Sequence, residues 1–70
     1  MSDKSVKEIW LENAVVHYEQ ARNAFLEGDM DTAKRQRDLM LEFLKGIRPS
    51  NRAGALGVDD NEYREVLEIE

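Results

Sequence analysis

The sequence predicts an all-α protein: an antiparallel two-helix hairpin, then a loop, then a short C-terminal helix or tail. Residues 6–45 carry apolar side chains at helical spacing, and this pattern is broken once, at Gly28-Asp29. The apolar arc on each predicted helix is wider than one neighbouring helix covers. We therefore expect oligomerisation to complete the hairpin as a helical bundle, with a homodimer as the expected species.

The first helix is expected to begin near Val6, because Ser5-Val6-Lys7-Glu8 fits a capping box. At about 100° per residue its apolar residues cover more than half of the circumference. Its polar residues fill the remainder. The apolar set is Val6, Ile9, Trp10, Leu11, Ala14, Val16, Tyr18, Ala21, Ala24 and Phe25.

A tight reversal is predicted at residues 28–31. Gly28 can adopt the left-handed conformation that ends a helix, and Asp29 or Asp31 can accept hydrogen bonds from the first amides of the next helix. The second helix is expected over residues 30–45, with Phe25 and Leu44 on the hairpin seam. Its apolar arc comprises Met30, Ala33, Met40, Leu41, Phe43 and Leu44.

The chain is interpreted as one domain with a hairpin at 1–45, a loop or linker at 46–58 and an acidic helix or tail at 59–70. Gly46 and Pro49 supply turn chemistry, and residues 53–57 have little side-chain bulk for a continuous helix. Residues 59–70 fit a short helix with Tyr63, Val66 and Leu67 on one face. Residues 66–70 also alternate as a strand does; we expect the helix.

Length and charge limit the classes of function. A chain of 70 residues has a marginal core, and with no cysteine and one histidine it has neither disulfides nor a histidine-rich metal site. The net charge is -5, and residues 58–70 alone hold six acids against Arg64. An acidic surface repels phosphate backbones and attracts cations. We expect a protein partner with a basic surface and regard nucleic acid as an unlikely partner.

Six residues are predicted to bind that partner. Trp10 is an aromatic anchor near the open end of the first helix, and aromatic side chains are common in binding hot spots. Arg37 interrupts the apolar arc of the second helix, so its guanidinium requires a partner across an interface or a position at its rim. In the acidic tail, the apolar residues are Tyr63, Val66, Leu67 and Ile69.

No constellation of residues indicates catalysis, and the chain is expected not to be an enzyme. His17 lies in an apolar arc without a second histidine, a cysteine or a neighbouring serine, so it is interpreted as a packed or interfacial residue. No cofactor or metal motif is present. Residues 1–4 begin no signal peptide and no long apolar run follows, which predicts a cytoplasmic protein outside the membrane.

The residues Ala21, Phe25, Gly28-Asp29 and Ala33 resemble the helix-turn-helix junction of a tetratricopeptide repeat, in which small residues permit close approach of the helices. The resemblance covers residues 21–33 alone. Because the sequence contains no second copy of the repeat, it implies a helical hairpin and no peptide-binding residues.

These observations favour a small acidic interaction module that acts as an adaptor, an inhibitor or a modulator of a larger protein. The alternative is a structural subunit of a larger assembly, such as a virion connector. A nucleic-acid-binding module that uses the basic residues of the second helix and the loop is the third interpretation, weakened by interleaved acids. The cations are Lys34, Arg35, Lys45, Arg48 and Arg52.

Overall fold

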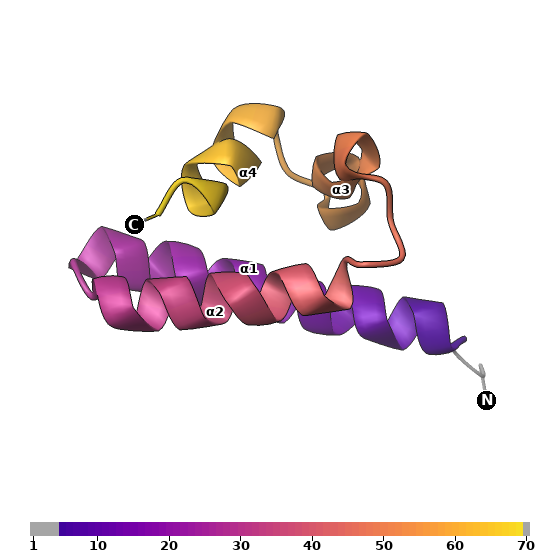
Figure 1. The fold of residues 1–70 in the computed structure, drawn as a ribbon, viewed down its shortest axis with the longest axis horizontal. Helices are drawn as coiled ribbons and strands as arrows, with labels where there is room; N and C mark the ends of the chain where they lie inside the picture. The colour runs from indigo at the N-terminus through magenta and orange to yellow at the C-terminus, as the bar shows by residue number, and fades with distance from the viewer. Residues whose placement is uncertain (1–4, 70) are drawn as a thin grey trace.

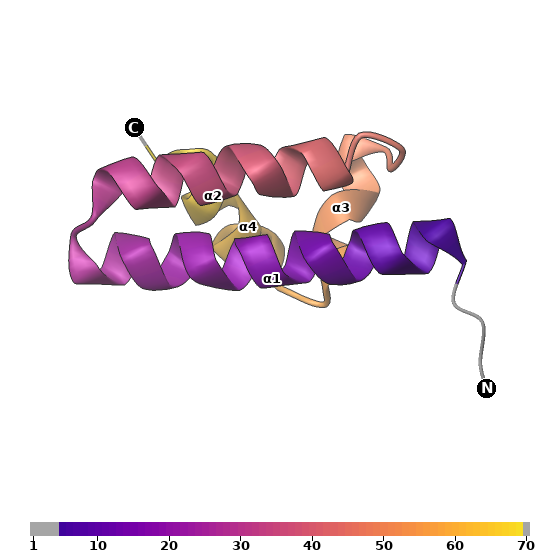
Figure 2. The same cartoon turned by 90° about the horizontal axis from the view of Figure 1, so that it is seen from below.

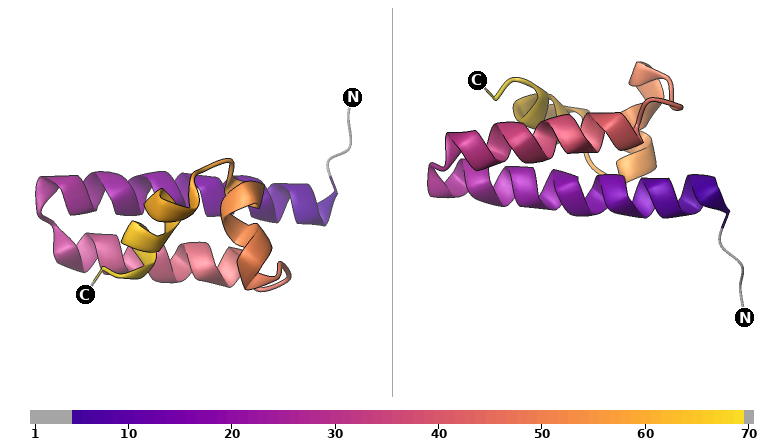
Figure 3. Two further views of the ribbon diagram at one scale, coloured as in Figure 1. Left: turned by 90° about the horizontal axis from the view of Figure 1, so that it is seen from above. Right: turned by 60° about the horizontal axis from the view of Figure 1, so that its bottom comes forward.

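A computed structural model describes residues 5–69, and within that range the chain forms four helices in two layers (Figure 1). The first layer is an antiparallel hairpin of α1 (Val6–Glu27) and α2 (Met30–Phe43). The second layer consists of α3 (Pro49–Leu56) and α4 (Asp60–Leu67), which lie across the hairpin (Figure 3). The predicted all-α hairpin is confirmed.

The ends of α1 and the start of α2 follow the predicted capping chemistry. The Ser5 hydroxyl accepts a hydrogen bond from the Glu8 amide at 3.2 Å. Gly28 ends α1 in the left-handed region, with a φ of 83° that favours glycine. The Asp29 carboxylate accepts from the Thr32 amide at 3.2 Å, and hydrogen bonding to Thr32 lowers the pKa of Asp29. Local sequence therefore specifies the reversal.

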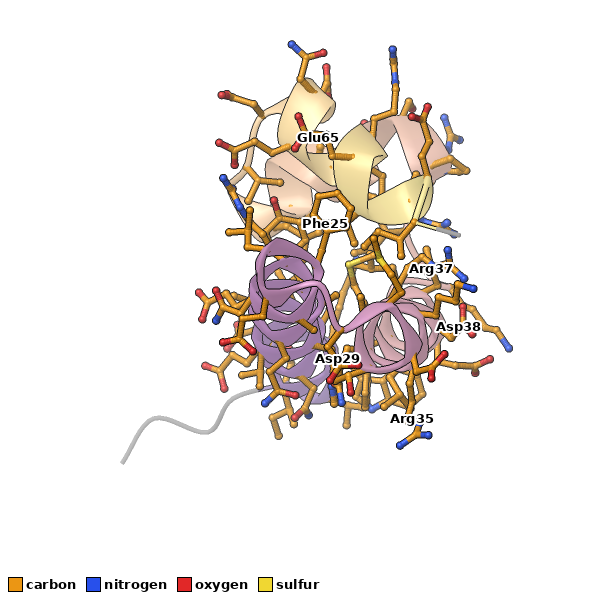
Figure 4. All side chains as sticks on the ribbon, turned by 90° about the vertical axis from the view of Figure 1, so that its left-hand side faces the viewer. Phe25, Asp29, Arg35, Arg37, Asp38 and Glu65 are labelled. Carbon is orange, nitrogen blue, oxygen red and sulfur yellow. The ribbon has the colours of Figure 1, made fainter. Side chains whose placement is uncertain are left out.

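Small residues form the seam between α1 and α2. Ala14, Ala21 and Ala33 are fully buried, so the two backbones meet with little side-chain bulk between them. Phe25 was expected on this seam, but it is 37% exposed, and in Figure 4 it points toward the second layer. Alanine on both helices near the turn leaves no space for a phenyl ring. The other expected seam residue, Leu44, is fully buried.

Helix α3 lies inside residues 46–58, where a loop was predicted, and this prediction is wrong. Pro49 occupies the first turn, where its missing N–H removes no intrahelical bond, and Gly57 ends the helix with a φ of 76°. Ala53 and Leu56 are buried on the core side of this helix. Tertiary contact thus stabilises a helix that its own composition does not indicate.

Helix α4 confirms the helical interpretation of the C-terminal segment, and the alternative strand at residues 66–70 is wrong as far as residue 69. Tyr63, Val66 and Ile69 are 7%, 2% and 3% exposed and belong to the same core as Met40 and Leu44. Residues 59–69 of the predicted helix or tail are therefore part of the fold, and residue 70 lies outside the described residues. The apolar residues of this segment cover part of one face of the hairpin.

Two polar contacts also join α4 to the hairpin. The Arg37 guanidinium of α2 donates through Nη1 to the carbonyl oxygen of Leu67 at 3.5 Å and to that of Ile69. It also pairs with Asp38 at 3.2 Å. A cation at the C-terminal end of a helix satisfies free carbonyls and opposes the negative end of the helix dipole. On the other side of α4, Glu62 pairs with Arg22 of α1 at 2.9 Å.

Replacement of Leu44 with alanine is expected to lower the free energy of unfolding by about 2 to 5 kcal/mol, because it removes a fully buried side chain. The matched change Phe25→Ala is expected to cost less than half as much, since more than a third of that side chain is exposed. Urea denaturation followed by circular dichroism measures both. Equal losses of stability would contradict this placement of the core.

Replacement of Arg37 with methionine retains most of the aliphatic stem but removes every donor to the end of α4. We expect a loss of about 1 to 3 kcal/mol, the range for hydrogen bonds to a charged group, with faster amide exchange at residues 66–69. Lys45→Met is the control, because Lys45 is exposed and its partner Glu42 is only three residues earlier in the chain. If both variants lose the same stability, Arg37 does not hold α4.

Candidate interaction surfaces

The structure separates the six residues that were predicted to bind a partner into two groups. Tyr63, Val66 and Ile69 are buried within the chain, and the donors of Arg37 are bonded to the backbone of α4, its side chain being 19% exposed. Trp10 is 48% exposed and Leu67 is 37% exposed, so only these two present apolar area to solvent.

The burial of Tyr63, Val66 and Ile69 changes the interpretation of the acidic tail. Apolar residues that close a core cannot also serve as exposed anchors without unfolding of α4. What α4 presents outward is charge: the exposed or half-buried acids are Asp59, Asp60, Glu62, Glu65 and Glu68. The apolar part of the predicted recognition element is thus structural, and its acidic part is accessible.

The contact between α1 and α4 leaves Tyr18 buried, at 4% exposure. Burial raises the pKa of Tyr18, because desolvation disfavours the phenolate more than the nearby Arg22 guanidinium favours it. The Tyr18 hydroxyl has no hydrogen-bond partner among the described residues. Tyr18 is therefore part of the closed core between α1 and α4.

The opposite side of the hairpin, which no second-layer helix covers, is seen from below in Figure 2. Val16 lies two residues from Tyr18, which is about 200° around α1, and Leu39 lies two residues from Arg37 on α2. Since Tyr18 and Arg37 face α4, Val16 and Leu39 face away from it. They are 47% and 38% exposed.

We call this surface the open face and define it by its uncharged residues. On α1 and α2 respectively, the open face comprises Ile9, Asn13, Val16, His17 and Gln20, and Thr32, Gln36, Leu39 and Phe43. All nine are exposed or half-buried. These nine residues are uncharged, but the same side of the hairpin also carries two charged residues. Glu27 follows Gln20 by seven residues and so lies nearly in line with it on α1, and Arg35 of α2 points away from the second layer in Figure 4.

Contacts between the two helices organise the centre of the open face. His17 Nδ1 and Gln36 Oε1 are 2.6 Å apart, and the His17 ring stacks on Phe43 with centroids 5.5 Å apart. Trp10 meets the same phenyl ring edge to face at 5.6 Å. His17 is thus a packed residue with a side-chain partner, consistent with the structural role expected for it. Its contacts keep several side chains of the open face in fixed positions.

Beyond the open face, α1 is longer than α2 and its first turns extend past the end of α2 (Figure 1). An open groove of about 410 Å³ lies at this end of the hairpin. Trp10 forms one wall, and Lys7 is its one charged lining residue. The other lining residues are Val6, Leu11, Phe43, Gly46 and Ile47.

A second groove, of about 330 Å³, lies between α3 and α4. Leu67 lines it together with Pro49, Tyr63 and Arg64. Its lining is more polar than that of the first groove, and it contains both Asp60 and Arg64. It therefore offers less apolar area to a partner than the groove beside Trp10.

Sequence reasoning missed the open face because it counted apolar residues and did not ask where charge was absent. Neutral polar residues separate the apolar residues of this face in the sequence, so the pattern resembles that of ordinary polar surface. They are Asn13 and Gln20 on α1, and Thr32 and Gln36 on α2. The available signal was the run of uncharged residues at helical spacing on both helices. It becomes one surface only when the two helices are placed side by side.

Among residues 5–69, no group of three or more histidine, cysteine, aspartate or glutamate side chains is arranged to hold a metal ion. No helix in the same range is long and apolar enough to cross a membrane. Comparison of the chain with protein-family models, with curated proteins and with solved structures found no match in any of the three. The candidate site is therefore defined by the physical chemistry of the open face, the groove beside Trp10 and the acidic surface of α4.

Proposed function

We propose that this chain is a protein–protein interaction module that works as a homodimer and acts as an adaptor, inhibitor or modulator of a larger protein. The observation that carries the proposal is the open face, which spans both long helices. Val16 and Leu39 supply exposed apolar area on both helices, and neutral polar residues such as Asn13 and Gln20 lie around them.

Depletion of charge is the compositional feature that distinguishes the centre of a protein interface from ordinary surface. Removal of a charged group from water costs several kcal/mol unless a partner compensates for it, so burial favours surfaces without such groups. Asn13, Gln20 and Gln36 carry neutral polar groups that can hydrogen-bond across an interface. This composition fits a surface that is covered in the working protein.

The neutrality of the open face also favours a second copy of the chain as its occupant. The charged residues on this side, Glu27 of α1 and Arg35 of α2, are of opposite sign, so the surface as a whole favours neither a basic nor an acidic partner. Two open faces can meet around a two-fold axis with few charged groups between them, and most of the acidic residues of each copy then stay at a distance. This pairing stacks the two hairpins face to face, so that α1 and α2 of both copies form a four-helix bundle.

The dimensions of the open face agree with this arrangement. At 1.5 Å per residue, the 22 residues of α1 give a length of about 33 Å, and two packed helices are about 20 Å wide. This gives on the order of 600 Å² for each copy, close to the roughly 800 Å² per partner of a standard interface. A 70-residue chain with a small core gains stability from such burial.

In such a dimer α4 remains exposed on both outer surfaces, since it covers the other side of the hairpin. Its acids, among them Asp60, Glu62 and Glu65, present negative charge to solvent. Charge of this kind increases the rate of encounter with a basic protein surface and sets the specificity of docking. The proposed module therefore pairs through a neutral face and recognises its larger basic partner through an acidic one.

The test is the mass of the protein in solution. Light scattering coupled to size-exclusion chromatography is expected to give twice the chain mass of 8.1 kDa at high micromolar concentration. Val16→Lys and Leu39→Lys place like charges opposite each other across the two-fold interface, so each is expected to give a folded monomer. Leu26→Lys is the matched control, because Leu26 is 70% exposed and lies outside the open face.

A wild-type protein that remains at 8.1 kDa at high micromolar concentration, with cooperative thermal unfolding, would contradict the proposal. Dimers that persist in both Val16→Lys and Leu39→Lys but dissociate in Leu26→Lys would place the interface elsewhere on the molecule.

A further inference from the structure

The groove at the overhanging end of α1 has an apolar floor. Helix α1 has 22 residues and α2 has 14, so the first turns of α1 have no partner helix along part of their length. Val6 is 70% exposed and Trp10 is 48% exposed at this end. Phe43 and Ile47 close the other side of the groove, which has a volume of about 410 Å³.

The rim of this groove is positively charged, in contrast to the rest of the protein. Lys7 lines the groove directly. Lys45 and Arg48 flank its lining residues Gly46 and Ile47 along the chain, and both are exposed. Lys45 forms an ion pair with Glu42 at 3.0 Å, whereas Lys7 and Arg48 make no ion pair within residues 5–69. A chain with a net charge of -5 thus has a local cationic rim around an apolar groove.

The shape and lining of the groove indicate the class of its occupant. Sites for small molecules are usually enclosed and contain several polar groups that converge on the ligand, whereas Lys7 is the one charged side chain in this lining and the Trp10 indole N–H its one other polar side-chain group. An open apolar groove between helices is typical of recognition of an amphipathic helix, whose apolar side chains enter the groove at helical spacing. The cationic rim then selects carboxylates on the flanks of that helix.

We propose that this groove binds an amphipathic helix of a partner protein, with large apolar side chains on one face and Asp or Glu on its flanks. The chain's own C-terminal segment does not meet this description, because the apolar residues Tyr63, Val66 and Ile69 of α4 are buried in the core. The groove shares Phe43 with the open face, but its other lining residues lie outside that face. The proposal goes beyond dimerisation, and a monomer offers the same groove.

Trp10 makes the proposal directly measurable, because it is the one tryptophan in the chain and forms a wall of the groove. The probes are a panel of synthetic helical peptides with Leu and Phe at i, i+3 or i+4, and i+7, and Glu on the flanks. A second panel has Lys in place of each Glu. We expect at least one Glu peptide to produce a saturable blue shift of Trp10 emission, and its Lys counterpart to bind at least fivefold more weakly.

Three variants of the full chain identify the site. Val6→Glu puts a carboxylate into the groove at a helix N-terminus that tolerates it, and is expected to weaken binding of the Glu peptide roughly tenfold. Lys7→Glu reverses the rim charge, and is expected to weaken binding roughly two- to fivefold. Val16→Lys is the control for the open face, because Val16 does not line the groove. Circular dichroism checks that all three remain helical.

Several results would overturn the proposal. One is the absence of a saturable change with every Glu peptide. Others are equal or tighter binding of the Lys peptides, or unchanged binding by folded Val6→Glu and Lys7→Glu proteins. Binding that is lost in Val16→Lys but retained in Val6→Glu would place the peptide on the open face. A monomeric wild-type protein that binds the Glu peptides at the groove would contradict the proposed dimer and support this inference.

Discussion

The close contact of α1 and α2 over a seam of alanines is the constraint on which the rest of the structure depends. Ala14, Ala21 and Ala33 are fully buried, so the space between the helices has no room for large side chains. The larger apolar residues of the hairpin must therefore point to one side of it or the other. A two-helix layer of this kind has two faces that each require cover.

The two faces of the hairpin differ in their exposure to solvent. One is covered by α3 and α4, with Val66 and Ile69 in the core and Arg37 bonded to the end of α4. The other remains exposed in the single chain, and Val16 and Leu39 lie on it among neutral polar residues. Within a single chain, therefore, only one of the two faces of the hairpin is covered. This asymmetry is the physical basis for the proposal that a second copy covers the other face.

Local signals allowed the hairpin to be predicted from the sequence. The Ser5 cap, Gly28 and the Asp29 cap act within a few residues, so their effect can be read without tertiary structure. Helix α3 was missed for the opposite reason. Its alanines and Gly54 form a helix because Ala53 and Leu56 pack on the hairpin, and that contact lies outside the local sequence.

The candidate site was predictable only in part. The position of Trp10 at an open end followed from its place early in the first helix, and the acidity of residues 58–70 was visible directly. The roles of Arg37 and Tyr63 were not, because an apolar arc with one cation looks the same whether it faces its own chain or a partner. Only the packing of α4 distinguishes the two cases.

The central claim is that the open face of one copy contacts the open face of another. The most direct measurement is an isotope-filtered NOE experiment on a mixture of labelled and unlabelled protein, observed at the methyl groups of Val16 and Leu39. The account predicts intermolecular cross-peaks at these methyls and none at those of Val66, which lies 2% exposed under α4. Intermolecular cross-peaks confined to other methyls, or their complete absence at high micromolar concentration, would contradict it.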